Sequence, residues 1–239
     1  MKILGIDSSG LVASVAVTED NLLLGEYTLN YKKTHSQTLL PMLDELRGML
    51  EMDMDSIDAI AVAAGPGSFT GLRIGSATAK GLGLALEKSL IPVPTVDALA
   101  WNLWGHKQFI CPIMDARRNQ TYTGLYFFDG KNEFHTVVEQ CAVDIHEIIK
   151  KINEEQHPVT FLGDGVPVFK EIIAQECKVE YDFAPAGMNR QRASALCLLG
   201  AKLFAAGKSV SAADFRPDYL RLSQAERERM EAQKKESES

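Results

Sequence analysis

The residues best suited to chemistry lie near the start of the chain, in the segment Gly5-Ile6-Asp7-Ser8-Ser9. An acidic side chain there follows a short apolar stretch and precedes a polar turn. Mg²⁺ prefers hard oxygen ligands and keeps several waters, so a carboxylate in this position suits a metal-bound nucleotide. The same residues also form ordinary Asx or Ser turns. We interpret the segment chiefly as a turn and secondarily as a degenerate nucleotide site, made of Asp7, Ser8, Ser9 and the similarly placed Asp115.

A second glycine-rich segment runs from Gly65 to Gly71, at the junction of an expected strand and an expected helix. Backbone N–H groups at a helix N-terminus attract anions. However, Leu72 follows Gly71 where a Walker A loop has Lys and Ser or Thr. We therefore expect a close-packed strand-to-helix turn and not a phosphate loop.

Reactive centres of the common kinds are missing from the sequence. None of the five histidines has another histidine three to five positions away, so no helical pair could hold Zn²⁺ or Fe. No G-x-S-x-G motif is present for a serine nucleophile. We expect no catalytic residue, no metal site and no cofactor.

The expected helix Thr70–Leu86 carries small residues every four positions, at Gly71, Gly75, Ala79 and Gly83. Each interior glycine costs about 0.5–1 kcal/mol relative to alanine, so a backbone must approach this face closely. The neighbour is either the protein's own sheet or a helix of another chain. We expect the second, with this face as a docking surface.

These residues must be positioned by an α/β scaffold in two similar halves. The first half begins with an antiparallel meander of three strands, Lys2–Asp7, Val12–Val17 and Leu22–Leu29. Helices and strands then alternate, as helix Thr34–Leu50, strand Asp58–Ala64, helix Thr70–Leu86, extended Ile91–Val96 and short helix Asp97–Trp104. The second half repeats the order in reduced form, with strands Phe109–Asp115, Thr121–Phe128 and Phe134–Val138, helix Ile145–Ile152, strand Val159–Leu162, helix Pro167–Cys177 and a further helix Ala193–Ala206. The pattern predicts a duplicated βββαβα unit; a single doubly wound domain is the alternative.

We divide the chain into residues 1–106, residues 107–222 and a charged tail, 223–239, which is too polar to bury a face. The protein has 239 residues, 46% of them hydrophobic, and a net charge of −7, which disfavours broad contact with nucleic acid. Asp7 interrupts the first apolar stretch, and no segment is long enough to cross a bilayer. The four cysteines form no C-x-x-C pair, so we expect reduced thiols and a cytoplasmic protein.

Five motifs make the chain resemble the TsaB (YeaZ) family. They occur in family order, and the third is specific by its length: Ile3-Leu-Gly-Ile-Asp-Ser-Ser9, Thr34-His-Ser-Gln-Thr-Leu-Leu-Pro41, Gly65-Pro-Gly-Ser-Phe-Thr-Gly-Leu-Arg-Ile-Gly75, Met114-Asp-Ala-Arg-Arg118 and Pro217-Asp-Tyr-Leu-Arg221. The resemblance implies the actin/hexokinase-like fold, also called ASKHA or ribonuclease H-like, in both halves.

The resemblance also implies a function: a non-catalytic subunit in the synthesis of threonylcarbamoyladenosine on tRNA. It would act as a heterodimer with the related catalytic subunit TsaD and with the ATPase TsaE, and would meet tRNA only through the complex. The metal-binding histidine pair of the catalytic relative is absent, because His35 stands alone. A homodimer is allowed when the partner is missing. The candidate interface residues are His35, Leu39, Met42, Gly71, Arg73, Ile74, Gly75, Thr78 and Ala79.

Two enzymatic functions compete with this interpretation. The first is a small ATP-binding phosphotransferase or ATPase of the same fold, which would use Asp7 and Asp115. The second is a metallopeptidase, which the missing ligand pair disfavours.

Overall fold

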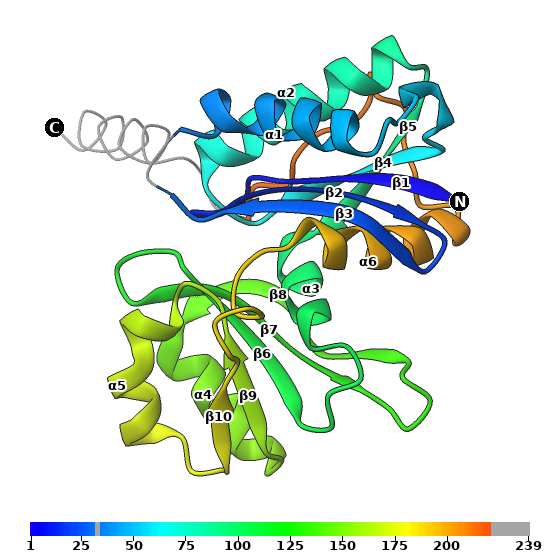
Figure 1. The fold of residues 1–239 in the computed structure, drawn as a ribbon. Helices are drawn as coiled ribbons and strands as arrows, with labels where there is room; N and C mark the ends of the chain where they lie inside the picture. Colours follow the sequence, from blue (N-terminus) through cyan, green and yellow to red (C-terminus); the bar gives the residue numbers. More distant parts are fainter. Residues whose placement is uncertain (32–33, 221–239) are drawn as a thin grey trace, which may run out of the picture.

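The computed structural model describes residues 1–31 and 34–220, so the expected tail 223–239 lies outside the described residues. The chain forms two lobes, each built on a five-stranded mixed sheet (Figure 1). In spatial order, the first sheet contains β3 (Leu22–Leu29), β2 (Ala13–Glu19), β1 (Lys2–Asp7), β4 (Ala59–Gly65) and β5 (Ser89–Pro94). The second contains β8 (Phe134–Asp144), β7 (Gln120–Phe128), β6 (Phe109–Asp115), β9 (Val159–Leu162) and β10 (Tyr181–Phe183).

The two sheets share one topology. In each, the first three strands form an antiparallel meander, and the fourth and fifth strands join parallel beside the first. Both spatial orders are therefore 3-2-1-4-5. This confirms the duplicated unit and the actin/hexokinase-like fold. The short strand β10 was not predicted, because its three residues carry too little periodicity to recognise.

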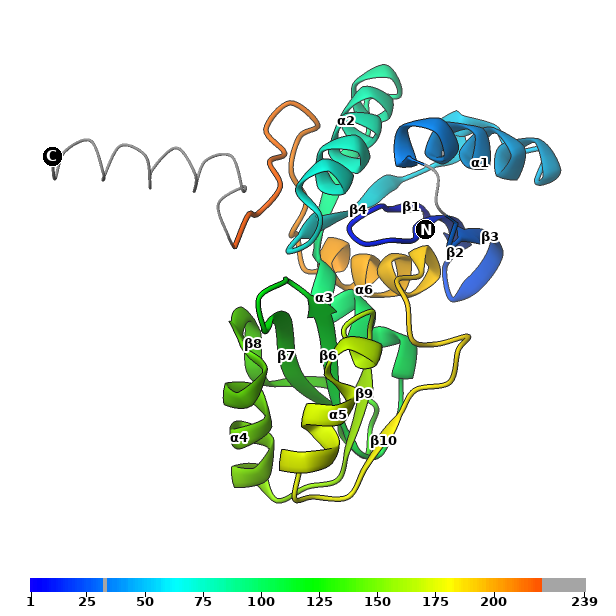
Figure 2. The same ribbon diagram turned by 90° about the vertical axis from the view of Figure 1, so that its left-hand side faces the viewer.

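Helices cover both faces of the first sheet. The helices α1 (His35–Met49) and α2 (Phe69–Ala85) lie side by side on one face (Figure 2), and α6 (Ala193–Ala205) covers the other. Strand β4 is buried along its whole length and consists largely of alanine, which lets helices approach closely. A Cβ on Gly200 of α6 would lie 2.9 Å from the Ala61 side chain.

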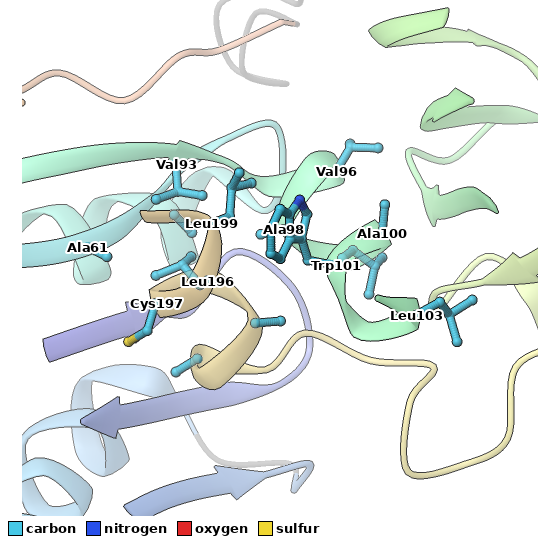
Figure 3. Close-up of a cluster of buried hydrophobic side chains, with 14 of the residues drawn as sticks. Ala61, Val93, Val96, Ala98, Ala100, Trp101, Leu103, Leu196, Cys197 and Leu199 are labelled. Carbon is cyan, nitrogen blue, oxygen red and sulfur yellow. The ribbon is translucent and has the colours of Figure 1, made fainter. Parts of the chain in front are cut away.

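Between the lobes lie α3 (Thr95–Ala100) and a short 3₁₀ turn, Trp101–Leu103. Their apolar side chains join those of α6 and β5 in one buried cluster (Figure 3). The outer face of the second sheet is covered by α4 (Ile145–Glu155) and α5 (Val166–Glu176). A 3₁₀ turn, Met54–Ser56, precedes β4.

The end of the described chain returns to the first lobe. Helix α6 packs on β1 and β2, and Val210 then pairs with Leu90 at the edge of the sheet. The segment Gly207–Leu220, here called the strap, continues along α2 and buries Phe215. The expected assignment of residues 107–222 to one C-terminal unit therefore differs from the packing, because α6 and the strap bury their apolar side chains on the first sheet.

No helix in the described ranges is long and apolar enough to cross a membrane.

Candidate functional site

The turn between β1 and β2 is organised by the carboxylate of Asp7, which is 1% exposed. Its Oδ1 accepts hydrogen bonds from the Ser9 backbone N–H at 2.9 Å and from the Ser9 hydroxyl at 2.6 Å. Burial raises the pKa of Asp7, because loss of water penalises the charged form; the bonds from Ser9 and the charge of His35 oppose this. Asp7 thus holds its own turn in place.

The first turn of α2 closes over this hairpin. The Ser8 hydroxyl donates to the Gly71 carbonyl oxygen at 2.8 Å, and the Ser68 N–H donates to the Ser9 carbonyl oxygen at 2.7 Å. A Cβ on Gly67 would lie 2.3 Å from the Ser9 oxygen, and one on Gly71 would lie 2.0 Å from the Ser8 oxygen. The predicted close-packed strand-to-helix turn is therefore confirmed, and glycine is needed because two backbones touch.

The second hairpin, between β6 and β7, differs from the first in exposure. Asp115 is exposed, and its Oδ1 accepts the Arg117 N–H at 2.7 Å. Its own N–H donates to Asp164 Oδ1 at 3.3 Å. Three consecutive residues of this turn have positive φ angles between 57° and 63°, namely Arg117, Arg118 and Asn119. Both aspartates therefore organise turns, but only Asp7 is covered by a helix.

His35 joins α1 to the first hairpin. Its Nε2 lies 2.8 Å from the Gly10 carbonyl oxygen, which places this ring beside the turn that Asp7 organises. One ring nitrogen of this predicted interface residue, the first residue of α1, is thus already hydrogen-bonded within the chain.

The glycine line of α2 faces the protein's own first lobe. Gly71, Gly75, Ala79 and Gly83 are all buried. A Cβ on Gly75 would lie 2.5 Å from Ser8 Oγ, and one on Gly83 would lie 2.9 Å from the Ala212 side chain of the strap. The expectation that this line is left bare for a partner is therefore wrong, because the hairpin and the strap already fill it.

The other predicted interface residues divide by exposure. Leu39 is buried in the core beneath α1, and Arg73 is exposed. The remaining four are half-buried, namely His35, Met42, Ile74 and Thr78.

A different small-residue line of α2 is exposed, at Ala77, Gly81 and Ala85, with Leu84 beside it at 59% exposure. A Cβ on Gly81 would meet nothing within 4 Å. On α1, Leu40 and Met49 are exposed as well, Met49 at 71%. Sequence reasoning missed this line, although its spacing of four residues matches that of the glycine line.

One group of possible metal ligands lies away from these helices, at the turn between β7 and β8. Single ligand atoms of Asp129, Glu133 and His135 lie within 4.8 Å of one another. Asp129 Oδ1 accepts the N–H groups of Lys131 and Glu133, and Asp129 Oδ2 lies 3.1 Å from His135 Nε2. These bonds lower the pKa of Asp129. The same hydrogen bonds hold the turn between β7 and β8, which gives the three residues a structural role.

Comparisons with known proteins agree with this architecture. The family model of TsaD, tRNA N6-adenosine threonylcarbamoyltransferase, matches residues 23–229. The tRNA threonylcarbamoyladenosine biosynthesis protein TsaB of Bacillus subtilis is 35% identical over 237 residues, which cover 98% of this chain and 100% of that protein. TsaB of Escherichia coli is 29% identical over 92% of this chain and 95% of that protein.

A solved structure shows the same fold. The structure of YeaZ from Pseudomonas aeruginosa superposes with a TM-score of 0.78 at 24% identity, covering 91% of this chain and 99% of that one. The full-length match to B. subtilis TsaB extends the likeness beyond fold to sequence. This chain therefore belongs to the TsaB (YeaZ) family of tRNA threonylcarbamoyladenosine biosynthesis proteins.

Proposed function

We propose that this chain is a non-catalytic partner subunit in threonylcarbamoyl transfer to tRNA, acting in the cytoplasm as a heterodimer with a TsaD-family transferase. The observation that carries the proposal is the closed hairpin at Asp7. The Ser9 N–H, the Ser9 hydroxyl and the Ser8 hydroxyl are all bonded within the chain. In an ATPase of this fold, the corresponding hairpin would have to offer such groups to phosphate.

The charge of the chain favours an indirect role toward tRNA. Its net charge is −7, whereas phosphate binding depends on Lys and Arg side chains. We therefore assign tRNA contact to the partner, and we place a TsaE-like ATPase in the same assembly on the strength of the family resemblance.

The exposed sides of α1 and α2 supply the docking surface in this proposal. Large apolar side chains stand exposed on both helices, at Leu40, Met49 and Leu84. Between large groups of this kind, the bare positions Ala77 and Gly81 allow another helix to approach closely. Large apolar groups beside small ones suit a helix-to-helix interface better than they suit solvent.

The test compares two glycines of α2 that differ in their surroundings. Gly81→Leu adds a side chain in open space and replaces glycine with a better helix former, so the monomer should melt at the same temperature or higher. The same side chain should hold a partner helix away and weaken binding by at least about tenfold, as expected at the centre of an interface. Isothermal titration calorimetry with the TsaD-family transferase of the same genome measures this.

Gly75→Leu is the matched control, because it adds the same side chain against Ser8 in the buried line. It should lower the melting temperature, since overpacking a core costs about 1–3 kcal/mol. If Gly81→Leu binds the transferase as tightly as the unmodified chain, the docking surface is wrong. If the unmodified chain does not bind the transferase, the proposed function itself is wrong.

A further inference from the structure

Three side chains form a stack at the beginning of α2, beside the proposed docking surface. The guanidinium carbon of Arg73 lies 4.7 Å from the centre of the Phe69 ring. The centre of that ring lies 5.0 Å from the centre of the Tyr219 ring, at an interplanar angle of 40°. Phe69 and Arg73 are four residues apart, so they share one face of the helix. Tyr219 reaches the stack from the strap.

Arg73 is exposed, and no described carboxylate forms an ion pair with it. Arg47 and Arg192, in contrast, are paired with Asp44 and Glu26. The other basic residue of α2 is also occupied, because Lys80 Nζ donates to two carbonyl oxygens of the strap. Arg73 therefore offers a charge that the described part of the chain leaves unneutralised.

The position of Arg73 adds to its local positive charge. The first turn of α2 contains no acidic residue. The partial positive charge at the N-terminus of the helix is thus not offset there. Long side chains on a helix point back toward its N-terminus, which brings the guanidinium close to this end. An anion meeting Arg73 would be attracted by both charges.

The ring of Phe69 also limits the freedom of the guanidinium. An arginine held on an aromatic face presents its planar donors in a fixed direction, and less entropy is lost when it binds a carboxylate with two hydrogen bonds. Arginine is one of the residue types enriched among those that dominate interface affinity. Arg73 lies one turn before Ala77, where the exposed small-residue line begins.

We propose that Arg73 determines partner specificity by binding a carboxylate side chain on the docking helix of the transferase. This inference rests on the proposed heterodimer. A protein carboxylate is favoured over a phosphate because the exposed residues that follow Arg73 along α2 are small or apolar, as at Ala77, Gly81 and Leu84. Phosphate-binding surfaces gather several Lys and Arg residues instead.

The test measures binding of the full chain to the TsaD-family transferase of the same genome at low and high salt. Arg73→Gln should weaken binding by about tenfold or more, as loss of one member of an interface charge pair does, and should flatten the salt dependence. The affinity of Arg73→Lys should lie between those of Arg73→Gln and the unmodified chain, because lysine keeps the charge but lacks the planar pair of donors that packs on Phe69. Phe69→Leu should weaken binding while Arg73 remains.

Lys150→Gln is the control for charge alone, since Lys150 is an exposed cation on α4 in the other lobe, and it should change neither affinity nor salt dependence. Binding by Arg73→Gln that matches the unmodified chain would overturn this inference and leave the heterodimer standing. A lower melting temperature for Arg73→Gln with unchanged binding would make the stack a structural feature and would also contradict it. If Arg73→Gln alters only self-association, measured by sedimentation, the carboxylate belongs to a second copy and the proposal is wrong.

Discussion

The hydroxyl of Ser8 donates a 2.8 Å hydrogen bond to the carbonyl oxygen of Gly71, at the point where α2 crosses the β1–β2 hairpin. The hydroxyl oxygen of Ser8 also occupies the space beside Gly75, one turn further along the helix. The Ser8 side chain therefore adds to the backbone contacts at Gly67 and Gly71 that hold the hairpin against α2. This relationship explains why the glycines of this line are needed within the chain itself.

Gly75→Ala should destabilise the protein by about 1–3 kcal/mol, because its Cβ would lie 2.5 Å from Ser8 Oγ. Adding Ser8→Ala removes that oxygen, so the double variant should lose less than the sum of the two single variants. Gly81→Ala is the control and should stabilise the helix, since alanine is favoured over glycine and the space is open. Urea melts of the four variants measure these differences; additive losses would contradict the assigned contact.

The strap should matter as much to stability as a core strand does. Phe215 is 1% exposed and packs in the core beneath α2, so Phe215→Ala should cost about 3–5 kcal/mol. Val168→Ala on the exposed side of α5 is the comparison and should change stability little. Thermal melts followed by circular dichroism distinguish these outcomes. A loss below about 1 kcal/mol for Phe215→Ala would mean that the strap is dispensable.

Asp97 should make the stability of the fold depend on pH. Burial raises its pKa to about 6, while its carboxylate accepts a 2.7 Å hydrogen bond from the Tyr126 hydroxyl. Between the unfolded value of 3.8 and about 6, the folded protein holds a proton that the unfolded chain releases. The stability associated with this group therefore falls as pH rises through that window, by up to about 3 kcal/mol.

Asp97→Asn removes this ionisation and keeps an oxygen that can accept from Tyr126. Relative to the unmodified chain, the variant should gain more stability at pH 7.5 than at pH 4. Denaturant melts at both values test this, with the exposed Asp182→Asn as the control. An equal difference at the two pH values would show that Asp97 does not titrate in this range.

The isolated chain should show no tight, Mg²⁺-dependent binding of ATP. The donors of Ser8 and Ser9 are bonded within the chain, and α2 covers the hairpin. Calorimetric titration with ATP and Mg²⁺ measures this directly. Micromolar binding that Asp7→Ala abolishes would instead support the phosphotransferase or ATPase alternative.

Local patterns in the sequence predicted most of the elements correctly. Strands such as Lys2–Asp7 and Phe109–Asp115 follow from short apolar runs ended by an aspartate, and their bounds agree with the structure. The repeated order of strands and helices was sufficient to predict the duplication. Spacing also revealed close packing at Gly71 and Gly75, because interior glycines weaken a helix and a line of them favours a close neighbour.

The neighbour that packs there depended on the tertiary structure. Ser8 is 67 positions before Gly75 in the chain, and Ala212 is 129 positions after Gly83, so no local pattern joins them. The return of α6 and the strap to the first lobe could not be predicted for the same reason. The sequence by itself thus determined the elements and the need for close packing on α2. Only the tertiary structure decided which face of α2 stays exposed, because burial depends on segments that are distant in the chain.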